Sequence, residues 1–176
     1  HSVKNSELRF ETQAVHAGVT PDPSTGAIMT PIFATSTYVQ SSPGKHQGYE
    51  YSRTANPTRK ALENAIAELE GAEFGLATGS GCSATDVICH LLQVGDEIIS
   101  TDDVYGGTSR LFRTVWGNHG VKTHFVDMTN ESIQSYLNPK TKLIWIETPT
   151  NPLLKIVDIA KVVEEAKKSP SKPLVV

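Results

Sequence analysis

The sequence has little cysteine, no long apolar run and no basic excess, and each scarcity excludes a class of protein. Two cysteines in 176 residues cannot form the disulfide framework of small secreted domains. No apolar segment approaches the ~20 residues that a membrane-spanning helix needs, and the polar start carries no signal-peptide pattern. With 16 Lys+Arg against 19 Asp+Glu, the chain lacks the positive charge of a nucleic-acid-binding protein. We therefore expect a globular protein whose partners include neither a membrane nor a nucleic acid.

The two cysteines favour a reducing compartment. Cys82 and Cys89 lie seven residues apart within one expected helix, a separation of about 10 Å along its axis. A disulfide needs Cα atoms within about 7 Å, so we expect both thiols to stay reduced. That expectation predicts a cytoplasmic location, with Cys89 as a small buried helix residue.

The first 55 residues differ from the rest because they lack periodicity and are rich in turn-forming residues. A long irregular segment is unusual inside a compact domain, so residues 1–55 are predicted to form an arm that packs on another subunit. A flexible terminus is the alternative. Residues 56–176 are predicted to form an α/β region that ends inside an expected strand, which suggests the N-terminal fragment of a longer polypeptide.

From Asn56 onward, helical periodicity alternates with short apolar runs. Asn56 is predicted to cap a helix that begins at Pro57, and Thr108 to cap a later one. Helices are expected over 57–70, 81–92, 108–116, 131–137 and 159–168, and strands over 74–78, 97–100, 121–126, 142–147 and 172–176. This alternation predicts right-handed βαβ units, and hence a largely parallel sheet covered on both faces.

Ligands of parallel sheets bind beyond the carboxyl ends of the strands, which singles out the loops 79–83, 101–108 and 148–152. The glycine-rich loop that opens a helix favours an anion, because free N–H groups and the helix dipole point at it. The pattern Gly79-x-Gly81-x-x-Ala84, with Asp102 and Asp103 about twenty residues on, matches a dinucleotide-binding fingerprint. Another phosphate-bearing cofactor, or a tight turn without a ligand, fits the same loop.

Other residues weigh against the dinucleotide interpretation. The fingerprint's strand usually begins the fold, whereas some seventy residues precede this one, and its apolar run is weak. Tyr105 follows the next strand, where an aromatic ring can lie flat on a heteroaromatic one, although an ordinary loop tyrosine is the simpler interpretation. Asn151, between two prolines, either bonds a ring substituent or serves the turn alone.

Tyr51 and Arg53 are a candidate phosphate-binding pair, with a surface pair as the alternative, because arginine binds phosphate through two parallel hydrogen bonds. None of the six histidines has a metal-ligand spacing, so we expect all of them to be structural. Asp102 and Asp103 are expected to serve loop chemistry and not to be a paired acid and base.

Four segments, in order and in register, resemble the Cys/Met-metabolism enzymes that use pyridoxal phosphate, and they displace the dinucleotide interpretation. They are residues 49–58 (YEYSRTANPT), 80–85 (SGCSAT), 102–108 (DDVYGGT) and 145–152 (WIETPTNP). The likeness is closest to the cystathionine gamma-lyases. Methionine gamma-lyases usually carry Cys at the position of Gly107. The resemblance implies a fold-type I architecture, in which this chain supplies the arm and the first part of the large cofactor domain.

The resemblance also implies roles for individual residues around pyridoxal 5'-phosphate. Ser80 and the backbone N–H groups of Gly81 and Cys82 would hold the phosphate, and Tyr105 would stack on the pyridine ring and act as a proton acceptor. Asn151 would bond the cofactor's ring oxygen or the substrate carboxylate. Tyr51 and Arg53 would reach the phosphate of a neighbouring subunit, so the active site would be shared within a homotetramer built as a dimer of dimers.

The implied reaction is gamma-elimination on L-cystathionine, which gives cysteine, 2-oxobutanoate and ammonia. A cystathionine gamma-synthase, a beta-lyase, a methionine gamma-lyase or a sulfhydrylase are alternatives within the family, and a truncated binding or assembly module is the alternative outside it. The family's acidic partner of the pyridine nitrogen is expected directly after Val176 and its Schiff-base lysine further on. The 176 residues alone are therefore not expected to turn over.

Overall fold

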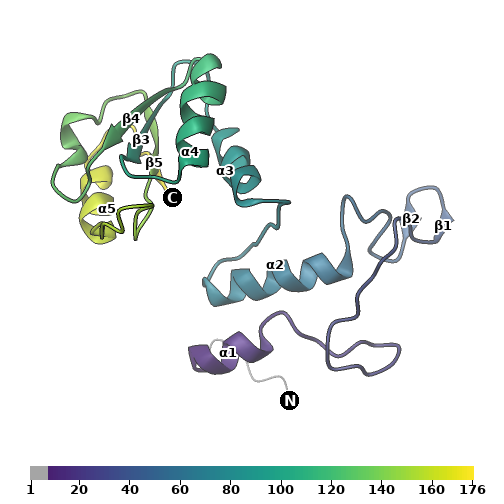
Figure 1. Ribbon diagram of the computed structural model, residues 1–176. Helices are drawn as coiled ribbons and strands as arrows, with labels where there is room; N and C mark the ends of the chain where they lie inside the picture. The colour runs from purple at the N-terminus through teal and green to yellow at the C-terminus, as the bar shows by residue number, and fades with distance from the viewer. Residues whose placement is uncertain (1–7) are drawn as a thin grey trace. The chain divides into compact units, whose positions relative to one another are not determined.

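Four parallel strands form the central sheet of the computed structural model, which describes residues 8–176 (Figure 1). Their order in the sheet is β4-β3-β5-β6, so β3, the first of the four along the chain, lies inside the sheet. The four are β3 (Glu97–Thr101), β4 (Lys122–Val126), β5 (Thr141–Trp145) and β6 (Leu174–Val175). Pairing of β3 with β4 and β5, and of β5 with β6, is parallel throughout, which confirms the predicted α/β class.

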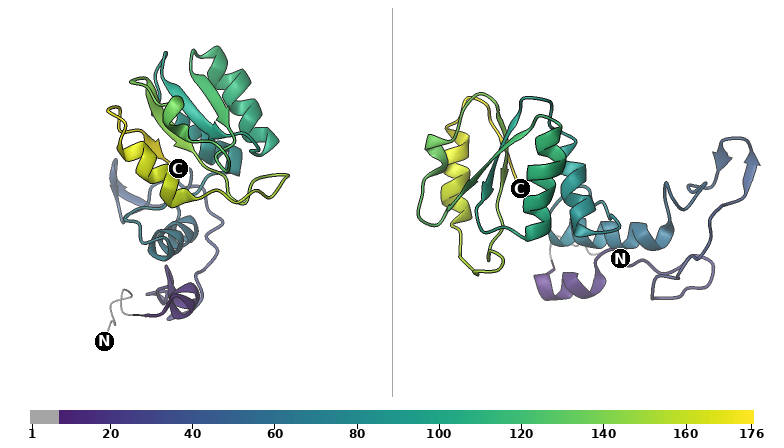
Figure 2. Two further views of the ribbon diagram at one scale, coloured as in Figure 1. Left: turned by 90° about the vertical axis from the view of Figure 1, so that its left-hand side faces the viewer. Right: turned by 45° about the horizontal axis from the view of Figure 1, so that its top comes forward.

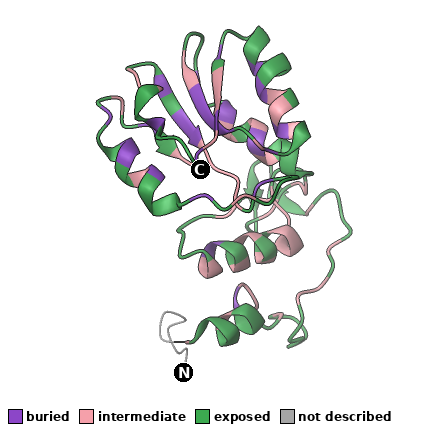
Figure 3. Ribbon diagram, turned by 60° about the vertical axis from the view of Figure 1, so that its left-hand side comes forward, coloured by how far each residue is buried: buried purple, intermediate pink, exposed green. Residues whose placement is uncertain are grey.

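Helices cover both faces of this sheet because successive strand residues point to opposite sides. Ile98 and Leu143 belong to a core beneath α3 (Gly81–Cys89) and the π-helical segment η2 (Leu111–Trp116). Their neighbours Ile99 and Ile144 belong to a second core beneath α5 (Ile159–Lys167). Figure 2 shows the strands of the sheet between helices on either side, and Figure 3 colours much of these strands as buried. Burial on both faces explains why adjacent strand residues such as Ile98 and Ile99 are both apolar.

Side-chain caps fix where the helices of this half begin. Ser80 caps α3 by accepting the N–H of Ser83, and Asp158 caps α5 by accepting the N–H of Lys161. A short 3₁₀ turn, η3 (Ile133–Ser135), replaces the longer helix expected over 131–137. The Glu165 carboxylate accepts the N–H of Ile133 and the hydroxyl of Ser132, so a side chain from α5 holds the start of the turn.

Helix α4 (Gly106–Arg110) corrects one expectation, because Thr108 does not cap it. Thr108 is buried inside the helix, and the cap position is Tyr105, whose side chain makes no capping bond. Gly106 and Gly107 have helical backbones, so the cap position lies three residues before the predicted one.

The N-terminal part contains more regular structure than its sequence indicates. It holds α1 (Phe10–His16), a hairpin of β1 (Gln40–Ser42) and β2 (Lys45–His46), and α2 (Pro57–Leu69). Asn56 caps α2 as predicted, with its side chain accepting the N–H of Thr58. Gly18 follows α1 with a φ of +68°, and a Cβ there would lie 2.3 Å from the Ala61 carbonyl oxygen, so only glycine lets the chain pass α2 this closely.

The strand predicted over residues 74–78 is wrong. This segment pairs with no strand in the described part of the chain, and Phe74 and Leu76 are exposed. Its Ala77 N–H instead donates to the Glu63 carboxylate of α2, at 3.1 Å. An apolar run becomes a strand only where a neighbour satisfies its backbone hydrogen bonds.

The chain divides into two compact units, residues 1–77 and 78–176. Helix α2 belongs to the first unit together with the described part of the arm, whose first seven residues lie outside the described range. The division into an arm over 1–55 and a cofactor domain over 56–176 stays a prediction about the whole protein. The second unit contains every loop that follows a strand of the parallel sheet.

Candidate functional site

The N-terminus of α3 presents unpaired hydrogen-bond donors. The Ser80 hydroxyl accepts the N–H of Ser83 at 3.1 Å and contacts the Ser83 hydroxyl at 2.9 Å. Within the described residues, the N–H groups of Gly81 and Cys82 have no hydrogen-bond acceptor, and both residues are exposed. Two free N–H groups at the positive end of a helix dipole form a site for a phosphate or another anion.

Tyr105 lies beside this helix N-terminus, and Gly107 makes the arrangement possible. A Cβ built on Gly107 would lie 2.4 Å from Tyr105 Cε1 and 3.2 Å from the Cys82 sulfur. The Tyr105 ring and Cys82 therefore meet over a backbone that carries no side chain. Tyr105 remains 53% exposed, so its ring is available to a second flat group.

Glu147, which follows β5, holds the backbone of Tyr105. Both carboxylate oxygens accept the Tyr105 N–H, at 3.2 and 3.1 Å. The Glu147 N–H in turn donates to the Thr101 hydroxyl at the end of β3, at 3.0 Å. Glu147 lies in the segment 145–152 that carries part of the family resemblance, but no role is predicted for it. Nothing in the sequence shows that its carboxylate reaches the neighbouring strand end.

Asn151 lies in a loop that Asp103 fastens to the end of β3. The Asn151 N–H donates to the Asp103 carbonyl oxygen at 3.3 Å. The Asp103 carboxylate accepts the hydroxyl of Thr150 at 2.6 Å and the N–H of Leu153 at 2.8 Å. Loop chemistry was expected of Asp103, but its connection to Asn151 was not, because the two residues are 48 positions apart.

Lys155 closes the same loop with an ion-pair network. Its ammonium lies 3.2 Å from the Asp102 carboxylate and 3.0 Å from that of Asp127. Hydrogen bonds from the Thr129 hydroxyl, and then from Lys155, hold the pKa of Asp127 well below its ordinary value, and Asp127 raises the pKa of Lys155 in return. Both groups therefore stay charged near neutral pH and fix the loop end to β3 and β4.

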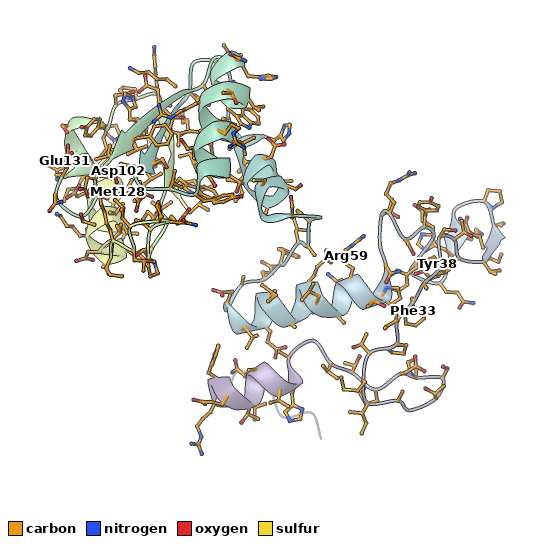
Figure 4. The ribbon with its side chains drawn as sticks, in the orientation of Figure 1. Phe33, Tyr38, Arg59, Asp102, Met128 and Glu131 are labelled. Atoms are coloured by element: carbon orange, nitrogen blue, oxygen red, sulfur yellow. The ribbon has the colours of Figure 1, made fainter. Side chains whose placement is uncertain are left out.

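Tyr51 and Arg53 lie in the first unit. The Arg53 guanidinium lies over the Tyr51 ring, 4.8 Å from its centroid. Arg59 projects from α2 (Figure 4) and donates to the carbonyl oxygens of Ser52, Arg53 and Thr54, at 3.1, 3.4 and 3.0 Å. The segment is thus fixed by α2 while the Arg53 side chain stays exposed.

Three histidines make local contacts within the second unit. His124 contacts Glu97 at 2.7 Å, His90 contacts Asp86 at 3.4 Å, and a ring nitrogen of His119 lies 2.9 Å from the Val115 carbonyl oxygen. No group of three metal-ligating side chains occurs among residues 8–176. No helix in that range is both long and apolar enough to cross a membrane.

These residues fit a cofactor that combines a phosphate with a flat ring. The free N–H groups could receive a phosphate, and an exposed tyrosine ring lies next to them over a glycine. Asn151 supplies an amide at a neighbouring strand end. The fold and the site together define a parallel-sheet α/β protein whose ligand site opens at the carboxyl edge of the sheet.

Comparison with known proteins identifies the family. Residues 11–176 match the sequence model described as Cys/Met metabolism PLP-dependent enzyme, and the chain belongs to this family. It is 51% identical over 166 residues to a cystathionine beta-lyase of Coxiella burnetii, covering 93% of this chain and 43% of that protein. It is also 51% identical over 152 residues to a cystathionine gamma-lyase of Sus scrofa, and this match covers 85% of this chain and 38% of that protein.

A solved structure supports the fold-type I assignment. The crystal structure of metB from Corynebacterium glutamicum matches with a TM-score of 0.92 and 41% identity. The match covers 98% of this chain and 45% of that one. The chain thus spans less than half the length of these relatives, and the enzymes of its family depend on pyridoxal phosphate.

Proposed function

We propose that the protein carrying this chain is a carbon–sulfur lyase that acts on L-cystathionine by gamma-elimination. The observation that carries the proposal is the pairing of free N–H groups on α3 with the Tyr105 ring beside them. Membership of the Cys/Met-metabolism family supports it, as does the similarity to a cystathionine gamma-lyase. The products would be cysteine, 2-oxobutanoate and ammonia.

The residues of this chain would bind the cofactor and handle one proton. The N–H groups of Gly81 and Cys82 and the Ser80 hydroxyl would hold the phosphate. The Tyr105 ring would lie on the pyridine ring, while its phenol oxygen would accept a proton from the substrate's amino group. When bound, pyridoxal phosphate withdraws electrons from the substrate Cα, which eases loss of the Cα proton. The Asn151 amide would orient the ring oxygen or the substrate carboxylate.

We also propose a homotetramer, built as a dimer of dimers, in the cytoplasm. Tyr51 and Arg53 would bind the phosphate held by a neighbouring subunit, which fits a guanidinium that is exposed while its backbone is fixed by Arg59. The free thiols of Cys82 and Cys89 support a reducing compartment.

The test is product analysis with the full-length protein, loaded with pyridoxal phosphate and given L-cystathionine. Gamma-elimination yields 2-oxobutanoate with cysteine, whereas beta-elimination yields pyruvate with homocysteine. Mass spectrometry of the oxo acids separates the two, and 2-oxobutanoate is the expected product. Pyruvate would overturn the proposal in favour of a beta-lyase, which the equal identity to the Coxiella burnetii relative makes the specific alternative. Synthesis of cystathionine from cysteine and a homoserine ester, without elimination, would point to a synthase.

A further inference from the structure

Asp103 bonds to both sides of Asn151 in the loop that follows β5. Its carboxylate oxygen Oδ2 accepts the Thr150 hydroxyl at 2.6 Å on one side and the Leu153 N–H at 2.8 Å on the other. Its carbonyl oxygen accepts the N–H of Asn151 itself, at 3.3 Å. One residue just beyond the end of β3 thus binds residues 150, 151 and 153 of this loop.

Asp103 and Thr150, joined by the hydrogen bond between their side chains, form a clamp on this loop. Thr150 is its buried residue. It is 1% exposed, and its hydroxyl both donates to Asp103 and accepts the Lys155 N–H at 2.8 Å. Its own N–H donates to the Lys155 carbonyl oxygen at 2.9 Å, which closes residues 150–155 into a turn. The buried Thr150 hydroxyl donates one hydrogen bond and accepts another. Breaking either bond would leave a buried polar group unpaired, so the residues around Thr150 are held rigidly.

The Asn151 side chain, in contrast, is exposed and makes no hydrogen bond in the described structure. Its own N–H, the Thr150 hydroxyl before it and the Leu153 N–H after it are all bonded to Asp103, while its side-chain amide stays free. This pattern suits a side chain whose partner is a ligand, because fixing the backbone in advance lowers the entropy lost on binding.

We infer that Asp103 is a positioning residue, which acts through Thr150 and Leu153 to aim the Asn151 amide at the bound cofactor or substrate. The inference rests on the proposed function, which places a ligand against Asn151. Asp103 itself would contact neither the cofactor nor the substrate. Its neighbour Asp102 differs in that its side-chain bonds go to the Lys155 ammonium and to the N–H of Asp103.

The experiment is a double-mutant cycle in the full-length holoenzyme. Asp103→Ala, Asn151→Ala and the double variant are compared for kcat, for KM and for the absorbance maximum of the bound cofactor. We expect Asp103→Ala to lower kcat/KM by about 10- to 100-fold, the scale of a misplacement near 1 Å. We expect it to shift the absorbance in the same direction as Asn151→Ala, and the double variant to match Asn151→Ala alone. If the double variant lost kcat/KM by the product of the two single losses, the inference would be overturned, because Asp103 would then act independently of Asn151.

Two further variants keep the test decisive if Asp103→Ala fails to fold. Thr150→Val removes the donated hydroxyl at nearly constant volume and is expected to reproduce the Asp103→Ala phenotype, whereas Thr150→Ser is expected to restore the activity. Asp102→Asn is the matched control and is expected to stay within about twofold of the native protein, as for a surface pair. If Asp102→Asn lowered kcat/KM as much as Asp103→Ala does, the inference would be overturned, because any negative charge in this loop would then have the same effect. Absence of turnover in the native protein would instead count against the proposed function, and the absorbance comparison would still test the clamp.

Discussion

Gly106 and Gly107 are adjacent glycines of α4 with opposite tolerance for a side chain. A Cβ on Gly106 meets nothing within 4 Å, whereas one on Gly107 would lie 2.4 Å from the Tyr105 ring. We expect Gly107→Ala to displace the ring and lower kcat by about 100-fold, because misplacement near 1 Å costs that much. Gly106→Ala, the control, is expected to keep full activity and to stabilise the helix by about 0.5–1 kcal/mol. Steady-state assays with thermal melting of both variants check this, and equal activity of the two would contradict it.

Cys82 and Cys89 differ in reactivity because only one of them meets solvent. Burial, assisted by the nearby Asp86 carboxylate, raises the pKa of Cys89 to about 12, whereas Cys82 is exposed. Since the thiolate is the reactive form, a chromogenic disulfide reagent at pH 8 is expected to modify Cys82 in the native protein and Cys89 only after unfolding. In the folded protein, Cys82→Ser should remove the modification that comes from these two cysteines, and Cys89→Ser should leave it unchanged. A fast reaction of Cys89 in the folded Cys82→Ser variant would show that the interior beneath α3 opens.

At the scale of elements, two caps of the same kind allow stability to be separated from ligand binding. Ser80 caps α3 at the proposed phosphate site, and Asp158 caps α5 with a bond of 3.0 Å to the Lys161 N–H. Ser80→Ala and Asp158→Ala are each expected to cost about 1 kcal/mol of the free energy of unfolding. Ser80→Ala alone is expected to weaken pyridoxal phosphate binding by about tenfold, because a hydrogen bond to a charged group is lost. Urea unfolding and cofactor titration measure the two effects, and equal cofactor affinities would remove Ser80 from the site.

Glu97 couples the stability of β3 to pH. The Asn138 amide donates to its carboxylate at 2.8 Å and His124 lies 2.7 Å away, and these contacts hold the pKa of Glu97 below its ordinary value. Because the folded pKa is lower than the unfolded one, the ionised carboxylate stabilises the fold above the unfolded pKa of about 4.3. This stabilisation is lost as pH falls through the folded pKa. The gap in urea midpoint between native protein and Glu97→Gln should therefore be widest at pH 6–7 and shrink towards pH 3; a constant gap would refute the coupling.

The elements that sequence reasoning predicted correctly are those whose signals are local. The cap at Asn56 and the helix it begins, as well as the apolar strands β3 and β5, follow from residues that lie within the element itself. The strand expected at 74–78 failed because a strand also needs a neighbour, and the sequence does not show where one lies. Helix α1 was missed since it is short and has no buried residue to mark a face.

The candidate site shows the same division between local and distant signals. Gly81, Cys82, Tyr105 and Asn151 could be named as candidates from the sequence because they follow strands or open a helix, where parallel sheets bind ligands. Their roles stay predictions. Glu147 and the Asp103–Thr150 clamp were not found, since they depend on contacts across more than 40 residues of sequence. Loops at neighbouring strand ends meet only once the order of the strands is known.

At the scale of the whole molecule, the proposed assembly makes each active site depend on two subunits. Tyr105 would act within its own subunit, while Arg53 would bind the phosphate held by its neighbour. An Arg53→Ala protein and a Tyr105→Phe protein are therefore each expected to be nearly inactive. Co-expression, or unfolding and refolding together, should create mixed dimers in which one of the two sites has every native residue.

The expected recovery can be calculated from random pairing. An equal mixture gives half mixed dimers, each with one intact site, so about a quarter of native activity should return, as for a symmetric two-subunit interface. The control is Arg53→Ala mixed with Arg53→Ala/Tyr105→Phe, where no intact site forms and no activity should return. Recovery in the first mixture alone would support a shared site. If neither mixture recovers activity although native mass spectrometry shows mixed oligomers, Arg53 acts within its own subunit, and the shared active site is refuted.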